Sequence, residues 1–385
     1  MMLNNLESEQ FDVVAAFLYG ELEEEIYMTM PKGYTKYLHK KGITKYSEKD
    51  NCLKLQKSIY GLVQAARQWW KRFKTVLENI GFKACQSDCC LFVRTEKDNK
   101  LTIILLYVDD GVVFGLRETI NEVLNAIAKE FEIKRMGQMK KYLGFELEIL
   151  KNSKELFITQ PKSISKIKEN FGSLLTGREA KIPAAPCTNV LRPIKGDELV
   201  SEEEQKQFRS GVGMLLFLIK HSRPDIANPV RELSKVLDGA SPLHFKYMIR
   251  VMKYVMETKD YGLHIKPNFI NNVFKLVGKA DSEFCGDRET RISVYGYVLY
   301  FCDAPISWRS KSGKSVTLSS TEAEYFALSE LAKEILFVKQ ILEHMRIQVE
   351  YPMIIHTDNI GAIYLSNNYT TSQRTRHIDT RYHFV

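Results

Sequence analysis

Residues 101–115 read LTIILLYVDDGVVFG, an apolar run that is broken once, by two aspartates and a glycine. The runs on either side are rich in β-branched and aromatic residues, which favour strands. Asp-Gly between two such runs is a common hairpin sequence. We therefore expect two antiparallel strands joined at Asp109-Asp110-Gly111, with the paired carboxylates at the tip.

The same aspartates also suit a metal site. Carboxylates on a tight turn present the hard oxygen ligands that Mg²⁺ prefers. A third carboxylate from a neighbouring strand would complete a site for two ions roughly 3.5–4 Å apart. Asp12, in the predicted strand 11–14, is the candidate for that ligand. A plain turn at Asp109 and Asp110, with Asp12 as an ordinary strand-end acid, is the alternative that these residues leave open.

The composition is that of a globular chain with two or three domains. The chain has 385 residues, of which 44% are hydrophobic and 26% charged. Its net charge of +8 is compatible with a polyanionic partner and equally with a basic soluble protein. No apolar run approaches the ~20 residues that span a bilayer. The polar, acidic N-terminus lacks a secretory leader, so we expect a protein that is not secreted.

The seven cysteines are sparse and odd in number, which is typical of a reducing compartment. Cys85, Cys89 and Cys90 lie close together in the sequence but lack a second Cys/His pair at a usable spacing. We interpret them as small packing residues.

Hydrophobic spacing predicts most of the remaining elements. Helices are expected at 65–80, 120–131, 205–220, 226–237, 242–258 and 321–345. Further strands are expected at 90–95, 142–150, 156–159, 294–301, 305–309 and 353–357. The Lys-rich stretch 23–49 is expected to be a loop or hairpin, and 172–204, rich in Gly, Pro, Thr and charge, a linker.

Four further acids occupy positions typical of a second metal site. Asp281 is expected to end a strand, Glu324 to lie in the first turn of a helix, and Asp358 to end another strand, while Asp379 lies in a polar C-terminal segment. Glu324 has a structural alternative, because TEAE at 321–324 fits a capping box. Glu322 stands in the same relation to Ser319 and is the fallback for the metal-ligand role.

Four sequence blocks occur in order around the first set of acids. They are DVVAAFLYGELEEEIYMTMPKGY (12–34), CLKLQKSIYGLVQAARQWW (52–70), YVDD (107–110) and KYLGFELE (141–148). This collinear series resembles the reverse transcriptase of Ty1/copia-type retrotransposon Pol polyproteins, and the resemblance extends from about residue 6 to residue 385.

The resemblance implies that Asp12, Asp109 and Asp110 bind two Mg²⁺ or Mn²⁺ ions. It places Phe17 under the incoming sugar, where the ring selects deoxynucleotides, although an ordinary core aromatic is the alternative. It implies that Tyr60-Gly61 lines the template and nucleotide pocket. Tyr142-Leu143-Gly144 is similar to the grip that positions the primer end.

A second series of blocks is similar to the ribonuclease H of the same polyproteins. The blocks are KADSEFCGD (279–287), PISWRSKSGKSVTLSSTEAEYFAL (305–328), IHTDNIGA (355–362) and RTRHIDTRYHFV (374–385). The resemblance implies that Asp281, Glu324, Asp358 and Asp379 hold two metal ions for RNA hydrolysis.

Two features of this second region can each be interpreted in two ways. His377 either helps product release or is an exposed or packing histidine. Trp308, Arg309, Lys311 and Lys314 interleave an aromatic with basic residues. They either track a nucleic-acid backbone or form a solvated hairpin tip.

The resemblance implies an α+β fold in three parts. These are a reverse-transcriptase palm at 1–160, a helical thumb or connection at 161–272, and a ribonuclease H-like α/β domain at 273–385. The expected partners are an RNA template, a DNA primer, an RNA–DNA hybrid and deoxynucleoside triphosphates. The expected location is the cytoplasm, within a virus-like particle, or the nucleus; the oligomeric state stays open.

The sequence also departs from the family pattern. It begins about ten residues before Asp12, where family members have the fingers of the polymerase. Ala66 stands where relatives usually carry proline, and Val or Ala replaces a lysine between Asp12 and Phe17. Two hypotheses remain: an active polymerase with ribonuclease H activity, or a truncated relic that at most binds or cleaves the hybrid.

Overall fold

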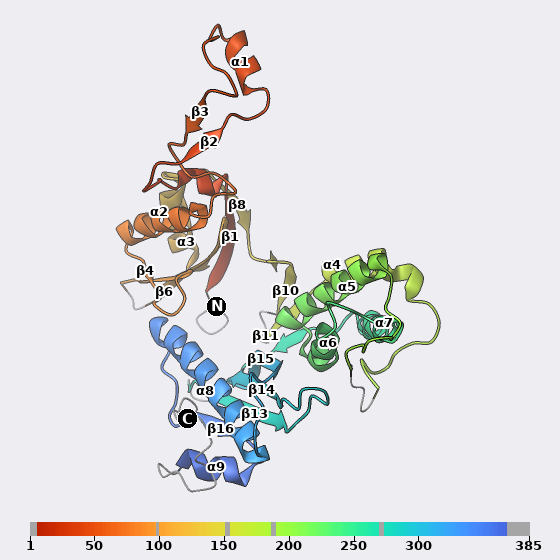
Figure 1. The fold of residues 1–385 in the computed structure, drawn as a ribbon. Coiled ribbons are helices and arrows are strands. Elements are labelled where there is room, and N and C mark those ends of the chain that lie inside the picture. The colour runs from red at the N-terminus through yellow and green to blue at the C-terminus, as the bar shows by residue number, and fades with distance from the viewer. Residues whose placement is uncertain (1–5, 98–99, 151–154, 186–189, 269–272, 368–385) are drawn as a thin grey trace. The chain divides into compact units, whose positions relative to one another are not determined.

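The computed structural model describes residues 6–97, 100–150, 155–185, 190–268 and 273–367 (Figure 1). The chain forms two compact units that divide between residues 139 and 140. Among the described residues, no helix combines the length and apolar character needed to cross a membrane. The predicted division at residues 160 and 272 differs from this boundary and stays a prediction about subdomain roles.

The N-terminal unit is built on an antiparallel sheet in the order β4-β5-β6-β7-β1-β8. Its strands are β1 (Glu7–Val13), β4 (Lys83–Ala84), β5 (Leu91–Thr95), β6 (Leu101–Tyr107), β7 (Asp110–Gly115) and β8 (Ile133–Gly137). Helices α2 (Ala65–Asn79) and α3 (Arg117–Ala128) pack against it. Alternate strand residues such as Phe92 and Ile104 share one core with Trp69 and Phe73 of α2.

Two short segments of this unit lie outside the sheet. The 3₁₀ helix η1 (Ala16–Tyr19) is separated from the end of β1 by two residues and places Ala16 in the core. Next come β2 (Tyr27–Thr29), α1 (Tyr34–Lys40) and β3 (Cys52–Lys54), which extend away from the six-stranded sheet (Figure 1). β2 and β3 pair only with each other among the described strands.

The C-terminal unit begins with a small antiparallel sheet and a helical layer. The sheet has the order β12-β11-β10-β9, with β9 (Lys141–Tyr142), β10 (Phe145–Leu150), β11 (Glu155–Thr159) and β12 (Leu263–Ile265). The helices are α4 (Pro161–Phe171), α5 (Glu202–His221), α6 (Ala227–Ser234) and α7 (Pro242–Glu257), with the 3₁₀ helices η2 (Gly172–Leu174) and η3 (Pro224–Ile226). The apolar faces of α4, α5, α6 and α7 form one continuous core.

A second sheet follows in the order β15-β14-β13-β16. Its strands are β13 (Leu276–Glu283), β14 (Val294–Phe301), β15 (Ala304–Ser312) and β16 (Ile354–His356), and only the β13–β16 pair is parallel. The long helix α8 (Ser320–His344) packs on β13 and β14, and α9 (Ile360–Asn367) follows β16. Leu331 of α8 lies where a side chain at Gly278 would stand, so helix and sheet approach closely there.

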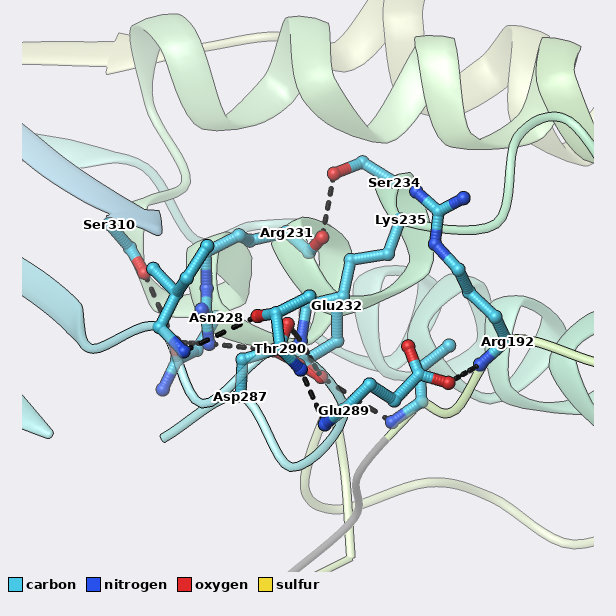
Figure 2. Close-up of polar contacts among 12 residues, drawn as sticks. Arg192, Asn228, Arg231, Glu232, Ser234, Lys235, Asp287, Glu289, Thr290 and Ser310 are labelled. Atoms are coloured by element: carbon cyan, nitrogen blue, oxygen red, sulfur yellow. Dashed lines mark hydrogen bonds and ion pairs between the residues drawn. The ribbon is translucent and has the colours of Figure 1, made fainter. Parts of the chain in front are cut away.

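Polar contacts join α6 to the loop between β13 and β14 (Figure 2). Lys235, the residue that follows α6, lies 2.9 Å from a carboxylate oxygen of Asp287, and both side chains are largely buried. Nearby, Ser310 of β15 donates a 3.1 Å hydrogen bond to Asn228. The Trp308 indole N–H donates to the backbone oxygen of Ile219 at 2.9 Å. Helical layer and second sheet are therefore held together by charge as well as by packing.

Most predicted elements are present, with small shifts at their ends. The helices predicted at 65–80, 242–258 and 321–345 correspond to α2, α7 and α8, and the strand predicted at 294–301 is β14. The elements that were not predicted include α1, α4, the edge strand β8 and the short strands β4 and β12. Because α1 has no buried residue and β8 has only one partially buried residue, neither shows a clear hydrophobic pattern.

Candidate functional site

The first candidate site lies where β1, β6 and β7 meet. Asp12 of β1 is paired directly with Asp110 of β7, and Asp110 is also the partner of Tyr107 in β6. The turn of the hairpin is Val108-Asp109, with Val108 at a φ of 59°. The position predicted for the turn, Asp109-Asp110-Gly111, was therefore wrong, because Asp110 is already the first residue of β7.

The backbone around these aspartates is firmly held. The amide of Val13 donates to the backbone oxygen of Asp109 at 2.9 Å, and the indole of Trp69 donates to that of Val108 at 2.5 Å. Trp69 is only 1% exposed, so the turn is tied to the core of the unit. These bonds compensate for the left-handed conformation of Val108, which is unfavourable for a β-branched residue.

The three carboxylates are neighbours but do not converge on one point. The side chain of Gln10 donates to Asp110 at 2.9 Å. The oxygens of Asp12, Asp109 and Asp110 do not all lie within 4.8 Å of one another. Three hard oxygen donors on adjacent strand ends are nevertheless the ligand type that divalent Mg²⁺ or Mn²⁺ takes.

An aromatic pair stands beside this site. The rings of Phe17 and Tyr60 lie 4.7 Å apart, and Tyr60 is 56% exposed. The hydroxyl of Ser58 donates to the backbone oxygen of Phe17 and links the two segments. Gly61 has a φ of 97°, which favours glycine. The structure thus brings together the residues predicted to line the nucleotide pocket, while their role stays a prediction.

The predicted primer grip is a tight hairpin between β9 and β10. Leu143 and Gly144 form its two-residue loop, both with positive φ (45° and 90°), as the commonest β-hairpin turn requires. A side chain at Gly144 would lie 2.9 Å from the ring of Phe217 in α5. Tyr142 packs edge-on against Phe145. This hairpin belongs to the C-terminal unit.

The second candidate site is an acidic cluster at one end of the second sheet. Carboxylate oxygens of Asp281, Glu324 and Asp358 all lie within 4.8 Å of one another. Asp281 lies within β13 rather than at its end, and Asp358 follows β16, the parallel neighbour of β13. Glu324 is in the second turn of α8, not in the first as predicted. The three acids come from three elements, which suits a metal centre.

The two candidate glutamates have different partners. Glu324 is 5% exposed, and its Oε1 accepts from the backbone N–H and the hydroxyl of Ser282 at 3.0 and 2.8 Å. Burial raises the pKa of Glu324, the Ser282 bonds oppose that shift, and the carboxylates of Asp281 and Asp358 add to it.

Glu322 instead caps α8. Its backbone N–H bonds to Ser319 at 3.1 Å, and its carboxylate accepts from the Leu318 amide at 2.6 Å. The geometry therefore joins Glu324, rather than Glu322, to Asp281 and Asp358. The N-cap residue of α8 is Ser319 and not Thr321.

A groove of about 450 Å³ adjoins Asp281. It lies between η3 and the start of α6 on one side and β13, β14 and β15 on the other, and Lys279 and Trp308 contribute to its walls. Because side chains alternate along β15, Trp308 and Arg309 face opposite sides of the sheet. Trp308 bonds to Ile219, and Arg309 lies over the ring of Tyr297 at 5.7 Å. The predicted basic–aromatic series is thus divided between two faces.

Two remaining predictions have mixed outcomes. Asp379 and His377 lie outside the described residues, so their roles stay predictions. The cysteine cluster was interpreted as packing, which is right for buried Cys85 and wrong for exposed Cys89. Burial, with the neighbouring Cys89, raises the pKa of Cys90 to about 11, which disfavours the thiolate that a metal would need.

Sequence reasoning missed the residues that support the acids. Gln10, Trp69 and Ser282 each bond to a site residue or to its turn. The only signal for Gln10 was its position two residues before Asp12, on the same face of a strand. No local pattern could have identified Trp69 or Ser282, because their partners are 39 and 42 residues away.

Comparison with known proteins identifies a matching family and several relatives. Residues 3–186 match the family model described as "Reverse transcriptase (RNA-dependent DNA polymerase)". The retrovirus-related Pol polyprotein from transposon TNT 1-94 of Nicotiana tabacum is 34% identical over 99% of this chain. That from transposon RE2 of Arabidopsis thaliana is 32% identical over 98%.

The extent of these matches is unequal. The chain spans 28% of the tobacco polyprotein and 24% of the Arabidopsis polyprotein. It covers the full length of the putative transposon Ty5-1 protein of Saccharomyces cerevisiae, which is 28% identical over 84% of this chain. The chain therefore corresponds to about a quarter of the first two relatives.

Proposed function

The chain belongs to the reverse transcriptase family of Ty1/copia-type Pol polyproteins, and we propose that it has RNA-directed DNA polymerase activity together with ribonuclease H activity. The polymerase would act at Asp12, Asp109 and Asp110, and the nuclease at Asp281, Glu324, Asp358 and Asp379. The chain's partners would be an RNA template, a DNA primer, their hybrid and deoxynucleoside triphosphates.

The polymerase proposal rests on the direct pairing of Asp12 with Asp110 beside the Asp109 turn. These carboxylates would hold two Mg²⁺ or Mn²⁺ ions, which in such sites activate the primer 3′-hydroxyl and stabilise charge on the phosphoryl group. The chain's own contribution is to keep the three acids on rigid strand ends. The bonds from Val13 and Trp69 to the turn serve that purpose.

The aromatic pair beside the acids supports selection of the sugar. We propose that Phe17 lies under the incoming nucleotide, where its ring would clash with a 2′-hydroxyl, and that Tyr60-Gly61 lines the same pocket. The contact between Phe17 and Tyr60 limits how far the Phe17 ring can retreat. We propose that the Tyr142-Leu143-Gly144 hairpin grips the primer.

The ribonuclease H proposal is carried by the convergence of Asp281, Glu324 and Asp358 within 4.8 Å. Three carboxylates so close repel one another, and a bound divalent cation would relieve that repulsion. Ser282 holds Glu324 in place through two hydrogen bonds. A hybrid would be recognised by its shape and 2′-hydroxyls, because no base needs to be read for this reaction.

Two assays on one substrate test the two activities separately. A labelled RNA–DNA hybrid with a recessed primer would be incubated with the chain, Mg²⁺ or Mn²⁺ and deoxynucleotides. Extension and RNA cleavage would be followed in the native chain, Asp109→Asn, Asp281→Asn and the control Asp238→Asn. The Asp238 side chain is 74% exposed and belongs to neither acid set.

Each variant has a distinct expected result. Asp109→Asn abolishes extension and leaves cleavage, Asp281→Asn abolishes cleavage and leaves extension, and Asp238→Asn behaves as the native chain. Absence of extension by a folded native chain would reject the polymerase proposal. Cleavage that survives in Asp281→Asn would reject the nuclease assignment.

A further inference from the structure

The net positive charge of the chain is concentrated in one short segment, residues 27–57. This segment, here called the arm, consists of β2, α1, β3 and the loops between them. The arm contains eight lysines and two acidic residues, Glu48 and Asp50, so its net charge is +6. The net charge of all 385 residues is +8. The rest of the chain is close to neutral, so the arm is the main electrostatic feature of the molecule.

The arm contributes little to the hydrophobic core of its unit. No residue of α1 is buried, and β2 and β3 form a separate two-stranded ribbon. A two-stranded ribbon with a short helix is marginal by itself, so maintaining it without a core suggests a purpose other than folding. Figure 1 shows the arm extending away from the sheet of the N-terminal unit.

The charges of the arm are available to a ligand. Among the described residues, Lys54 is the one arm lysine that forms an ion pair, with Glu25 at the base of the arm. The exposed lysines of the outer part have no carboxylate within 4 Å in the described structure. They are Lys32, Lys36, Lys40, Lys41, Lys45 and Lys49.

Exposed aromatic rings are interleaved with these lysines. Tyr27 and Tyr37 are each 55% exposed, and Tyr46 is 36% exposed. The ammonium groups of Lys41 and Lys45 lie 5.9 and 5.0 Å from the ring centroids of Tyr37 and Tyr46. Lysines for phosphates and exposed rings for base stacking are the two components with which proteins bind single-stranded nucleic acid.

The base of the arm stands at the first candidate site. The chain leaves η1 at Gly20 and returns at Ser58, whose amide donates to the Gly20 oxygen at 2.9 Å. Ser58 also bonds to Phe17, and Tyr60 contacts the Phe17 ring. A strand that lies along the arm would therefore run directly to the Phe17–Tyr60 pair.

We propose that the arm binds the single-stranded part of the template as it approaches the polymerase site, an inference that rests on the proposed polymerase function. The arm lysines contact phosphates, and Tyr37 and Tyr46 stack on unpaired bases. Binding is indifferent to sequence, because these contacts read neither base edges nor a groove.

The test compares two hybrids that differ only at the template end. Both have the same RNA–DNA duplex; one is blunt, and the other carries a single-stranded 5′ template overhang of about 12 nucleotides. Their affinities would be measured by fluorescence anisotropy without nucleotides over a range of salt concentrations. The variants are a triple Lys36→Gln, Lys40→Gln, Lys41→Gln change and Tyr37→Ala with Tyr46→Ala.

A matched control replaces Lys97, Lys100 and Lys129 by Gln, because these exposed lysines belong to the same unit but lie outside the arm. The native chain and the control should bind the overhang hybrid more tightly than the blunt one. Because each phosphate contact contributes about 0.7 to the salt slope for single strands, the arm lysine triple should lower that slope by about 2. The tyrosine pair should lower overhang affinity about tenfold, and neither change should alter blunt-hybrid affinity.

Several results would overturn the proposal. One is that the native chain binds the overhang hybrid no more tightly than the blunt hybrid. Another is that the triple lysine variant of the arm keeps both its tighter binding of the overhang hybrid and the salt dependence of the native chain. Equal loss on both hybrids would show that the arm holds duplex and not single strand. Since binding is measured without synthesis, failure of primer extension in the native chain would reject the polymerase while leaving this result to stand.

Discussion

Gly111, next to Asp110 of the first candidate site, leaves no space for a side chain. A side chain there would lie 2.2–2.8 Å from ring atoms of Phe11, which is fully buried. We expect Gly111→Ala to displace that ring and destabilise the N-terminal unit by about 1–3 kcal/mol. Urea unfolding would measure the loss as a lower midpoint. Gly213→Ala is the control: it meets no atom within 4 Å in α5 and should be neutral or slightly stabilising.

A double-mutant experiment with Phe11 tests whether the clash with this ring causes the destabilisation. If the clash is the cause, Phe11→Leu should cost less in the Gly111→Ala background than in the native chain. Strictly additive effects would contradict this explanation.

At the scale of single residues, the sequence predicted that Asp12 and Asp110 lie on neighbouring strands but not the structural reason for each residue. Asp12, Asp109 and Asp110 were predicted to meet, and the β1–β7 pairing does bring Asp12 opposite Asp110. Gly111 was read as part of a turn, whereas its requirement arises from Phe11 on the neighbouring strand. Such a requirement depends on residues 100 positions apart, which no short pattern can contain.

Within one turn, α8 carries an acid that caps the helix and an acid that we propose to be catalytic. Glu322 caps the helix through the Leu318 amide, whereas Glu324 faces Asp281 and Asp358. We expect Glu322→Ala to cost about 0.5–1 kcal/mol of stability and to leave hybrid cleavage nearly unchanged. Glu324→Ala should reduce cleavage by about a hundredfold or more, which corresponds to about 2.7 kcal/mol in the barrier.

The measurements are urea unfolding and single-turnover cleavage on the same preparations. Equal loss of cleavage in both variants would contradict the separation of roles. If cleavage were lost only with Glu322→Ala, the fallback assignment would be correct and the arrangement of α8 would have to change on binding.

Elements with strong periodicity could be predicted from the sequence, because their apolar residues repeat at one spacing. α2 and α8 begin and end within one or two residues of the prediction. The edge strand β8 was missed, since four of its five residues are exposed and its identity depends on pairing with β1. The arm was recognised only as a Lys-rich loop or hairpin, since its ribbon is short and its helix has no buried face.

For the whole molecule, the sequence could not predict how the helical layer joins the second sheet. That junction depends on Lys235 and Asp287, which are 52 positions apart and each unremarkable in their local sequence. Burial of Asp287 raises its pKa, but Lys235 and the backbone amides of Glu289 and Thr290 outweigh that effect and lower the pKa to about 2. The ionised form is therefore favoured by folding.

This shift predicts how the stability of the C-terminal unit depends on pH. Because the folded pKa lies below the unfolded value of about 3.9, the Asp287 contribution is present above pH 4 and is lost as the pH falls toward 2. Asp287→Asn keeps an oxygen to accept from Glu289 and Thr290 but removes the charge of one of the two carboxylates that pair with Lys235, the other being Glu232. We expect it to cost about 1–2 kcal/mol at pH 7.

Urea midpoints of the native chain and Asp287→Asn at pH 7, 5 and 3 would test this prediction. The two proteins should differ at pH 7 and 5, and the difference should shrink at pH 3 as the native carboxylate approaches its own pKa. Asp238→Asn is the matched control, because its partner Arg192 is 58% exposed and an exposed pair contributes little. A gap that persists or widens at pH 3 would mean that the Asp287 charge is not what stabilises the junction.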